Sequence, residues 1–291
     1  MAKRVAIIGF GEAAQAFVGG AGWSGDVRAY DKLTDDPAGR EAKLADYREF
    51  NVKGADRIDE ALENAEIVLS LVTADQASSV AREAAPHLQA GAIYCEMNSV
   101  GPATKNSGAV AVEQSGSRFV DVAIMSPVNP YRLETPLLLS GTQALDAEQD
   151  LRAIGFANVR TIGSRVGEAS AVKMIRSVIV KGIEALTAEA MLAASEAGVI
   201  DEVLTSLDAS ERPMSWADRA NYNLDRMMAH GVRRAEEMDE VARTLSALGV
   251  APHLTRVIAL RQREIGRLGL RPAATLGEKL AQLRSGKADA A

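Results

Sequence analysis

Cysteine is almost absent from the sequence: Cys95 is the only one in 291 residues. A single thiol excludes a disulfide within the chain and is typical of a protein of the reducing cytoplasm, where we expect this one. Histidine is scarce too, with three residues in all, and the sequence has no H-x-x-x-H or C-x-x-C spacing. We therefore expect no metal site.

Long apolar runs are missing as well. No stretch approaches the roughly 18 apolar residues that a membrane-spanning helix needs. The opening run, MAKRVAIIG, is short and leads directly into a glycine-rich turn, so it predicts a strand and not a signal peptide. The formal net charge of -6 gives no sign of a nucleic-acid partner. We expect a small-molecule ligand, without nucleic acid or membrane as a partner.

A glycine-rich turn follows the first predicted strand, residues 4–8. It consists of Gly9, Phe10, Gly11, Glu12, Ala13 and Ala14, a G-x-G-x-x-A pattern between a strand and a helix. The first glycine permits the tight turn, the second lets the backbone approach a pyrophosphate, and the alanine lets helix and strand pack closely. The pattern predicts that these residues bind a dinucleotide.

An aspartate, Asp31, ends the second predicted strand, Asp26–Tyr30, about 20 residues after Gly11. A carboxylate there accepts hydrogen bonds from an adenosine ribose and repels a 2′-phosphate, which favours NAD over NADP. Lys32 follows directly, and an adjacent cation can soften this preference, so NADP stays possible. In the alternative interpretation Asp31 is a turn or helix-capping residue.

Polar residues also follow later strands. Ligands collect at the carboxyl ends of parallel strands, so we expect Val72 and Thr73 to face the cofactor. By the same argument Asn98 and Ser99 contact the nicotinamide or the substrate. The alternative is that Asn98 and Ser99 form a turn and cap the next helix.

The stretch from Gly163 to Gly198 contains no proline and is rich in alanine, leucine, methionine and glutamate, which predicts a long helix. Its apolar residues go nearly all the way round, as in a helix buried among other elements. Lys173 is anomalous there, because a lysine removed from water loses its proton more readily and can act as a base near neutral pH. Ser177 lies one turn further on the same face. The alternative is that Lys173 reaches solvent or forms a structural ion pair.

The remainder of the chain gives only helical signals, and it holds a group of cationic side chains at spacings of three and four: Arg226, His230, Arg233 and Arg234. Such a face can clamp a substrate carboxylate, and we expect His230 and Arg233 to take part. In the alternative interpretation it is a solvated face that pairs with neighbouring carboxylates.

Together these signals predict an α/β protein in three parts. A doubly wound, parallel sheet of the Rossmann type occupies residues 1–163, because short β-branched runs alternate there with helical stretches. A long helix in residues 164–198 joins it to an all-α domain in residues 199–291, which we expect to serve substrate binding and dimerisation.

The order of the motifs resembles the β-hydroxyacid dehydrogenase family, which includes 3-hydroxyisobutyrate and 6-phosphogluconate dehydrogenases. The resemblance covers almost the whole chain and rests on GFGEAA, Asp31, the EMNSVGP turn, the DVAIMSP loop and a G-x-x-x-G-x-x-x-x-x-K pattern that ends at Lys173. The second half resembles a less characterised branch with a 6-phosphogluconate-dehydrogenase-like helical domain. The family pattern implies that Lys173 is the general base, that Asn98 and Ser99 contact cofactor and substrate, and that residues 121–127 line the substrate site.

The sequence departs from the family pattern at several site positions. Pro127 stands where the family usually has a glycine whose amide binds the substrate carboxylate, and proline has no amide proton. Met125 indicates a more apolar pocket, and we expect it to line the substrate site with Ser126 and Ser177, the last in place of the usual asparagine. Val180 replaces the acid of 6-phosphogluconate enzymes, which argues against oxidative decarboxylation.

We therefore expect an NAD(P)-dependent dehydrogenase that transfers a hydride between the nicotinamide and a 3-hydroxy acid or related secondary alcohol, with Lys173 as the general acid and base. An imine reductase of the same architecture is one alternative, although such enzymes often replace the lysine. A non-catalytic nucleotide-binding protein is another. We also expect a homodimer, because the long apolar helices carry more hydrophobic surface than one small helical domain can bury.

Overall fold

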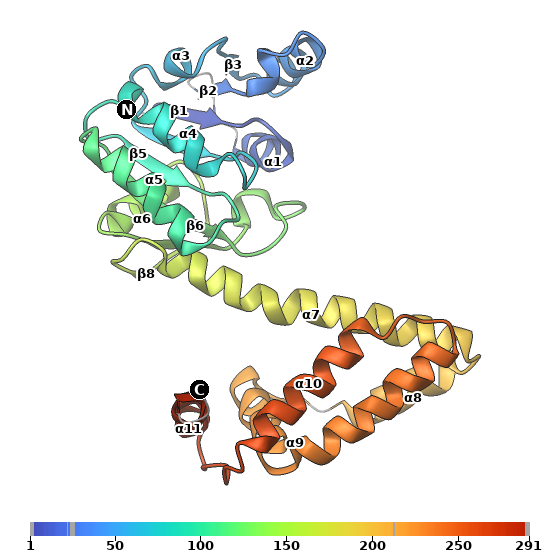
Figure 1. Ribbon diagram of the computed structural model, residues 1–291. Helices are drawn as coiled ribbons and strands as arrows, with labels where there is room; N and C mark the ends of the chain where they lie inside the picture. Colours follow the sequence, from blue (N-terminus) through green and yellow to red (C-terminus); the bar gives the residue numbers. More distant parts are fainter. Residues whose placement is uncertain (1–2, 22, 24–26, 212, 289–291) are drawn as a thin grey trace. The chain divides into compact units, whose positions relative to one another are not determined.

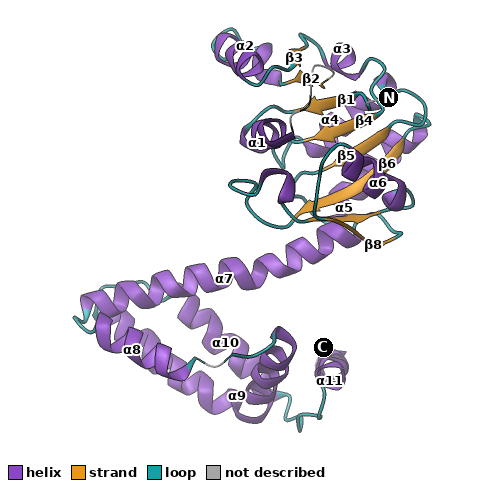
Figure 2. Cartoon of the chain, turned by 180° about the vertical axis from the view of Figure 1, so that it is seen from behind, coloured by secondary structure: helices purple, strands orange, loops and turns teal. Residues whose placement is uncertain are grey.

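The computed structural model describes residues 3–288 except 22, 24–26 and 212. The chain divides into two compact units, Met1–Val178 and Ile179–Ala291. All strands that the structure describes belong to the first unit, and the second is helical (Figure 2). The predicted combination of a Rossmann-type sheet, a long helix and an all-α part is confirmed.

The first unit is built on one eight-stranded sheet. Its strands are β1 (Val5–Ile8), β2 (Val27–Tyr30), β3 (Lys53–Gly54), β4 (Ile67–Ser70), β5 (Ile93–Glu96), β6 (Arg118–Ile124), β7 (Leu137–Ser140) and β8 (Val159–Gly163). They lie in the order β3-β2-β1-β4-β5-β6-β7-β8, with β1 to β6 parallel and β7 antiparallel to β6. The order reverses between β1 and β4, and ligands of such sheets bind at the carboxyl ends of the strands beside this point.

Helices cover both faces of this sheet (Figure 1). They are α1 (Glu12–Ala21), α2 (Arg40–Glu49), α3 (Ile58–Leu62), α4 (Ala77–Ala84), α5 (Pro102–Gln114) and α6 (Ala144–Ala153), with short 3-10 turns η1 (Lys32–Thr34), η2 (Ala85–His87) and η3 (Arg132–Glu134). Successive strand residues point to opposite faces. Phe17 of α1 and Leu151 of α6 pack on one face, while Leu62 of α3 and Val112 of α5 pack on the other.

The second unit consists of long helices. Helix α7 (Glu168–Glu196) begins in the first unit and ends in the second, and is followed by α8 (Ile200–Ser210), α9 (Trp216–Ala247), α10 (His253–Arg267) and α11 (Leu276–Ala288). α9 and α10 approach each other closely at Gly231, where a Cβ atom would collide with the carbonyl of Gln262. Within the described part of the chain, no helix combines the length and apolarity needed to cross a membrane.

Two expectations need correction. The long helix is not buried on all sides in the single chain: Ile175 and Val178 are 71% and 74% exposed, because one chain supplies too few neighbours for an all-round apolar helix. The sequence pattern does not single out helix α5, and it does not single out helix α11, which continues to Ala288. Asp26, expected in the second strand, lies outside the described residues.

Candidate active site

The turn after β1 has the conformation that its glycines predict. Gly9 has φ +86°, and a Cβ there would lie 2.5 Å from the carbonyl oxygen of Leu71, so only glycine fits. Gly11 differs, because apart from Gly11 and its two chain neighbours no heavy atom of the described residues lies within 4 Å of the place where its Cβ would stand. α1 starts directly afterwards at Glu12, and Ala14 is fully buried against the sheet. A helix N-terminus beside open space suits a phosphate group.

Asp31 holds this turn from one side. Its Oδ2 accepts a hydrogen bond from the N–H of Phe10 at 2.7 Å, and its Oδ1 accepts one from the N–H of Leu33 at 3.0 Å, which caps η1. The capping interpretation of Asp31 therefore describes part of what it does. Because each carboxylate oxygen can accept more than one hydrogen bond, the same group keeps acceptor capacity for a ligand.

Three residues that the sequence did not single out hold the turn from the other side. Lys43 is buried and donates from Nζ to the carbonyl of Phe10 at 2.7 Å and to Asp46 Oδ2 at 2.7 Å. Gln15 donates to the same two oxygens at 3.3 and 3.0 Å. Both backbone polar groups of Phe10 are thus fixed, which orders the turn before a ligand binds.

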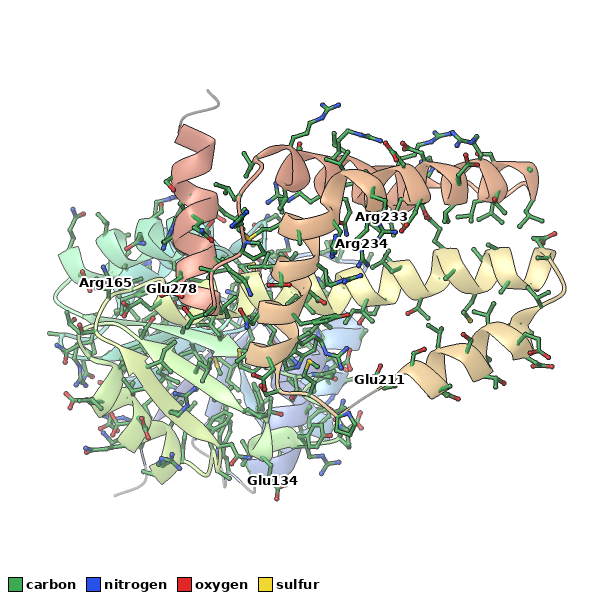
Figure 3. All side chains as sticks on the ribbon, turned by 90° about the horizontal axis from the view of Figure 1, so that it is seen from below. Glu134, Arg165, Glu211, Arg233, Arg234 and Glu278 are labelled. Carbon is green, nitrogen blue, oxygen red and sulfur yellow. The ribbon has the colours of Figure 1, made fainter. Side chains whose placement is uncertain are left out.

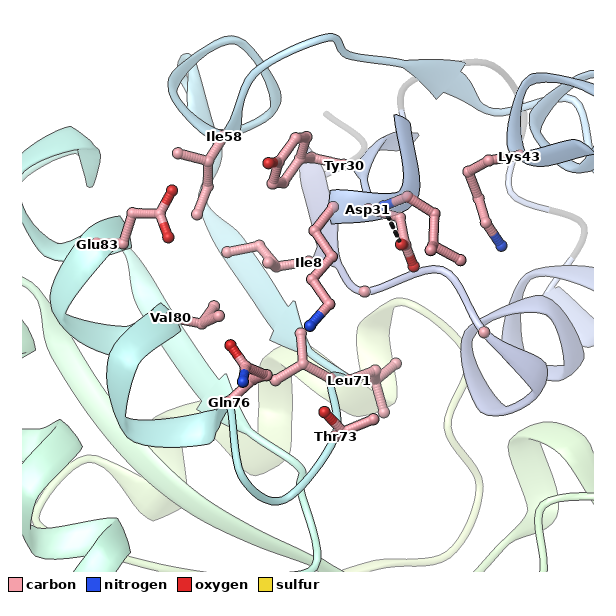
Figure 4. A pocket seen from close by; sticks show the side chains of 15 residues that line it. Ile8, Tyr30, Asp31, Lys43, Ile58, Leu71, Thr73, Gln76, Val80 and Glu83 are labelled. Carbon is pink, nitrogen blue, oxygen red and sulfur yellow. Dashed lines mark hydrogen bonds between the residues drawn. The ribbon is translucent and has the colours of Figure 1, made fainter. Parts of the chain in front are cut away.

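A pocket of about 490 Å³ opens beside the turn. Apolar side chains such as Ile8, Ile58 and Val80 form much of its lining, and Asp31 and Thr73 contribute polar groups (Figure 4). Val72, like Thr73, was expected to face the cofactor, and both line this pocket. The volume and the mixture of walls suit a flat, partly apolar ligand with hydroxyl groups.

Tyr30, the last residue of β2, also lines the pocket. Its hydroxyl donates to Asp35 Oδ2 at 2.6 Å. Burial, reinforced by this hydrogen bond and by the charge of Asp35, raises the pKa of Tyr30 well above its ordinary value. The phenol therefore stays neutral and does not repel an anionic ligand.

Lys173 and Ser99 meet at the carboxyl end of β5. Lys173 Nζ donates to Ser99 Oγ at 2.6 Å. Ser99 follows β5 by three residues, and the parallel strands β1 and β5 place it at the same edge of the sheet as the Gly9 turn. Lys173 is half-buried, so its side chain is only partly removed from water.

Asn98, which precedes Ser99, faces the protein interior. Its Nδ2 donates to Ser70 Oγ at 3.2 Å and to the carboxylate of Glu96, and its backbone N–H donates to Glu96 Oε1 at 3.1 Å. Asn98 Oδ1 is buried and has no hydrogen-bond partner among the described residues. An acceptor in this state suits a ligand N–H.

Asp121 of β6 fixes the start of the helix that carries Lys173. Its Oδ2 accepts hydrogen bonds from the N–H groups of Gly167 and Ser170 at 3.1 and 3.0 Å, and from Ser140 Oγ at 3.1 Å. A carboxylate at this position satisfies donors that a helix leaves unpaired and is favoured by the helix dipole.

The residues expected around the substrate lie near the first turns of α7. Met125 is half-buried and packs with Leu138 and Ala169. Ser126 Oγ donates to the carbonyl of Pro127 at 3.2 Å. Ser177 Oγ donates to the carbonyl of Lys173 at 2.9 Å, so in this structure the hydroxyl binds its own helix.

His230 and Arg233 belong to the second unit, on α9, where both are exposed. Arg233 forms an ion pair with Glu237 one turn along, as the solvated-face interpretation expects, and Figure 3 shows its side chain next to that of Arg234. Among the described residues, no group of three or more His, Cys, Asp and Glu side chains is arranged to hold a metal ion.

Comparison with protein families gives matches in both units. Residues 5–145 match the NAD binding domain of 6-phosphogluconate dehydrogenase, and residues 194–265 match a domain of unknown function, DUF1932. An uncharacterised 28.5 kDa protein of Methanothermus fervidus is 30% identical over 191 residues, which are 66% of this chain and 72% of that protein.

Solved structures of the same architecture cover nearly the whole chain. A conserved hypothetical protein from Sinorhizobium meliloti 1021 is 36% identical, with a TM-score of 0.62 over 98% of this chain and 97% of its own. A conserved protein of unknown function, described as structurally similar to 3-hydroxyacid dehydrogenases, is 29% identical, with a TM-score of 0.58 over 93% and 100%. An imine reductase from Myxococcus stipitatus in complex with NADP+ is 18% identical, with a TM-score of 0.73 over 95% and 99%, which shows a shared fold alone.

Proposed function

Since this chain belongs to the β-hydroxyacid dehydrogenase family, in a branch that combines the NAD binding domain of 6-phosphogluconate dehydrogenase with DUF1932, we propose a specific reaction for it. It is an NAD(P)-dependent oxidoreductase that transfers a hydride between the nicotinamide and a 3-hydroxy acid or related secondary alcohol. The observation that carries this proposal is the 2.6 Å hydrogen bond from Lys173 to Ser99 at the carboxyl edge of the sheet.

The residues around the first turn fit a dinucleotide. Gly11 leaves open space in front of the N-terminus of α1, where a pyrophosphate is attracted. Asp31 keeps acceptor capacity for the hydroxyls of an adenosine ribose while the pocket between Ile8 and Val80 takes the adenine. The carboxylate of Asp31 favours NAD over a cofactor that carries a 2′-phosphate. Asn98 Oδ1 suits the N–H of a carboxamide.

The bound nicotinamide supplies or accepts the hydride, and Lys173 handles the proton. A neutral amine that donates one N–H to Ser99 Oγ keeps its lone pair for the proton of a substrate hydroxyl. In the opposite reaction, reduction, the ammonium of Lys173 donates a proton to the carbonyl oxygen of the substrate. Ser99 therefore orients the amine of Lys173 during both oxidation and reduction. Met125 contributes an apolar wall on the substrate side.

The test is a panel of aliphatic and aryl 3-hydroxy acids with NAD and with NADP, followed by the absorbance of the reduced cofactor. We expect turnover of at least one acid, and Lys173→Met to lower kcat by about 10²-fold or more while NADH still binds. Lys181→Met, the same substitution two turns along the same helix, is the matched control and should leave kcat unchanged. Near-normal turnover of Lys173→Met would contradict the assignment.

The same panel separates the alternatives. An imine reductase is the second candidate because its fold is shared with a TM-score of 0.73, and cyclic imines with NADPH replace the hydroxy acids in that arm. Oxidation of a secondary alcohol that needs Lys173 favours the dehydrogenase. Binding of NADH without turnover of any compound would indicate a non-catalytic nucleotide-binding protein.

We propose further that the chain acts as a homodimer. The exposed apolar side chains of α7 and α8 include Ile175, Val178, Ile179, Ile183, Leu204 and Leu207. Water-exposed apolar area of this extent on consecutive helices marks an interaction surface, and a second copy of the same chain is the commonest occupant. Sedimentation velocity at micromolar concentration should give twice the chain mass, and a monomer would contradict the proposal.

A further inference from the structure

A fully buried lysine, Lys105 of α5, lies beneath the sheet edge that carries Ser99. Its ammonium forms ion pairs with Glu96 and with Asp121, whose Oδ1 is 3.2 Å away. It also donates hydrogen bonds to the backbone carbonyls of Glu96 at 2.6 Å and Val122 at 3.2 Å. All three charged side chains are at most 3% exposed. Burial of charged groups costs several kcal/mol per ion, and removing one partner of such a cluster is costly.

The sheet brings the two carboxylates together. Glu96 of β5 and Asp121 of β6 are register partners on neighbouring parallel strands, so their side chains leave the same face. α5 packs on that face through Ala109 and Val112. Two carboxylates this close to one another repel, and a single ammonium from α5 stabilises both.

The first carboxylate controls the turn that presents Ser99. Glu96 Oε1 accepts the backbone N–H of Asn98 at 3.1 Å, and the same carboxylate accepts a hydrogen bond from Asn98 Nδ2. A displacement of Glu96 therefore displaces the 97–99 turn and the hydroxyl that Lys173 contacts.

The second carboxylate controls the helix that presents Lys173. Asp121 Oδ2 accepts the N–H groups of Gly167 and Ser170, and Ser140 Oγ, bound to the same oxygen, accepts the N–H of Ala169 at 2.9 Å. Lys173 follows Ser170 by one helical turn. A displacement of Asp121 therefore moves the base of the segment on which the amine is carried.

We propose that Lys105 is a positioning residue whose ammonium, shared by Glu96 and Asp121, sets the distance between Ser99 Oγ and Lys173 Nζ. Lys105 does not touch the substrate and acts only through the two carboxylates. The kinetic consequence rests on the proposed function, whereas the geometric one does not. Misplacement of a reacting group by about 1 Å is enough to lower a rate by about 10²-fold.

Lys105→Met tests this role, because methionine keeps the length and apolar stem and removes the charge. Lys43→Met is the matched control, since Lys43 is another buried lysine of the first unit and holds the dinucleotide turn instead. Each variant is compared with wild type in kcat, in the dissociation constant of NADH, and in the NMR titration of lysines labelled with ¹³C at Cε. The signal of Lys173 is assigned as the one missing in Lys173→Arg.

We expect Lys105→Met to shift the Lys173 titration and to lower kcat at least about 10-fold, with the NADH dissociation constant within about 2-fold of wild type. Lys43→Met should do the reverse: weaker NADH binding and an unchanged Lys173 titration. If the titration is unchanged in Lys105→Met, or equally shifted in both variants, the positioning role is overturned. If Lys105→Met shifts the Lys173 titration but the wild-type protein turns over no hydroxy acid, the positioning role stands and the proposed function is refuted.

Circular dichroism and thermal unfolding show whether Lys105→Met folds. If it does not, the double variant Lys105→Met/Glu96→Gln replaces it, because this variant leaves only one buried carboxylate without a cation. The same shift of the Lys173 titration is expected in the double variant, and its absence there counts against the proposal in the same way.

Discussion

The two glycines of the first turn should respond in opposite ways to the same substitution. At Gly9 an alanine meets two costs: φ of +86°, which costs an L-residue about 1–2 kcal/mol, and a Cβ placed 2.5 Å from the Leu71 carbonyl oxygen, which adds about 1–2 kcal/mol of backbone shift. The sum is about 2–4 kcal/mol. For a unit of this size that corresponds to a decrease in Tm of roughly 4–16 °C.

At Gly11 the Cβ of an alanine meets no atom of the described residues within 4 Å apart from its chain neighbours, and the φ of Gly11 is not in the left-handed region. Restricting the unfolded chain should then stabilise the protein by about 0.4–1 kcal/mol. The methyl group would, however, occupy the space in which we place the pyrophosphate. We expect the dissociation constant of NADH to rise at least about tenfold, which corresponds to about 1.4 kcal/mol.

Differential scanning fluorimetry and calorimetric titration with NADH measure both quantities on the same preparations. Gly9→Ala should lose Tm, and Gly11→Ala should keep or raise Tm while losing affinity. Wild-type affinity in Gly11→Ala would refute the placement of the pyrophosphate, and an unchanged Tm in Gly9→Ala would refute the described turn.

Two further predictions concern carboxylates that accept backbone hydrogen bonds. In the second unit, burial alone would raise the pKa of Glu189, but hydrogen bonds from the Thr255 hydroxyl and from the N–H groups of Leu254 and Thr255 outweigh it and hold the pKa below its usual value. A carboxylate whose pKa is lowered in the folded state stabilises the fold at neutral pH, and this contribution disappears as the pH falls. Urea unfolding should therefore show Glu189→Gln to be about 1 kcal/mol less stable than wild type at pH 7, and this difference should shrink below about pH 4. A stability difference that does not depend on pH would contradict this prediction. In the first unit, Asp31→Ala should weaken the binding of NADH by about tenfold and the binding of NADPH by less, because only NADPH gains from removal of the negative charge. Fluorescence titrations measure both affinities. Equal losses of affinity for the two cofactors would show that Asp31 only caps η1.

The sequence was informative wherever a local rule decides the structure. β-Branched runs that end in glycine or polar residues predicted the buried strands. The spacing from Gly11 to Asp31 predicted that the glycine-rich turn and this aspartate act together, and in the structure the N–H of Phe10 in the turn donates a hydrogen bond to Asp31. Helix α5 is hard to recognise in the sequence because Pro102, Gly108 and the two polar residues Asn106 and Ser107 weaken its helical pattern. With α5 unassigned, Lys105 could not be placed on a face of the sheet.

The Lys105 cluster also shows why the candidate site could be predicted only in part. Glu96 and Asp121 each end or interrupt an apolar run, and either one alone resembles a turn or capping residue. Their proximity depends on the register of β5 against β6, which no spacing along the chain reveals. A charged residue at the same height of two neighbouring buried strands is therefore a signal only after the strands have been paired.

For the long helix α7, the apolar pattern alone did not predict burial within a single chain. Its all-round apolar pattern correctly identifies side chains that are unfavourable in water, but Ile175 and Val178 remain exposed in a single chain. Lys173 lies in the same segment and is half-buried, so the chemistry proposed for it depends on Ser99 and on the capped start of α7 more than on removal from water. The apolar pattern of the helix shows which side chains need a packing partner. Whether these partners come from the same chain or from a second copy determines how strongly an ionisable neighbour such as Lys173 is hydrated.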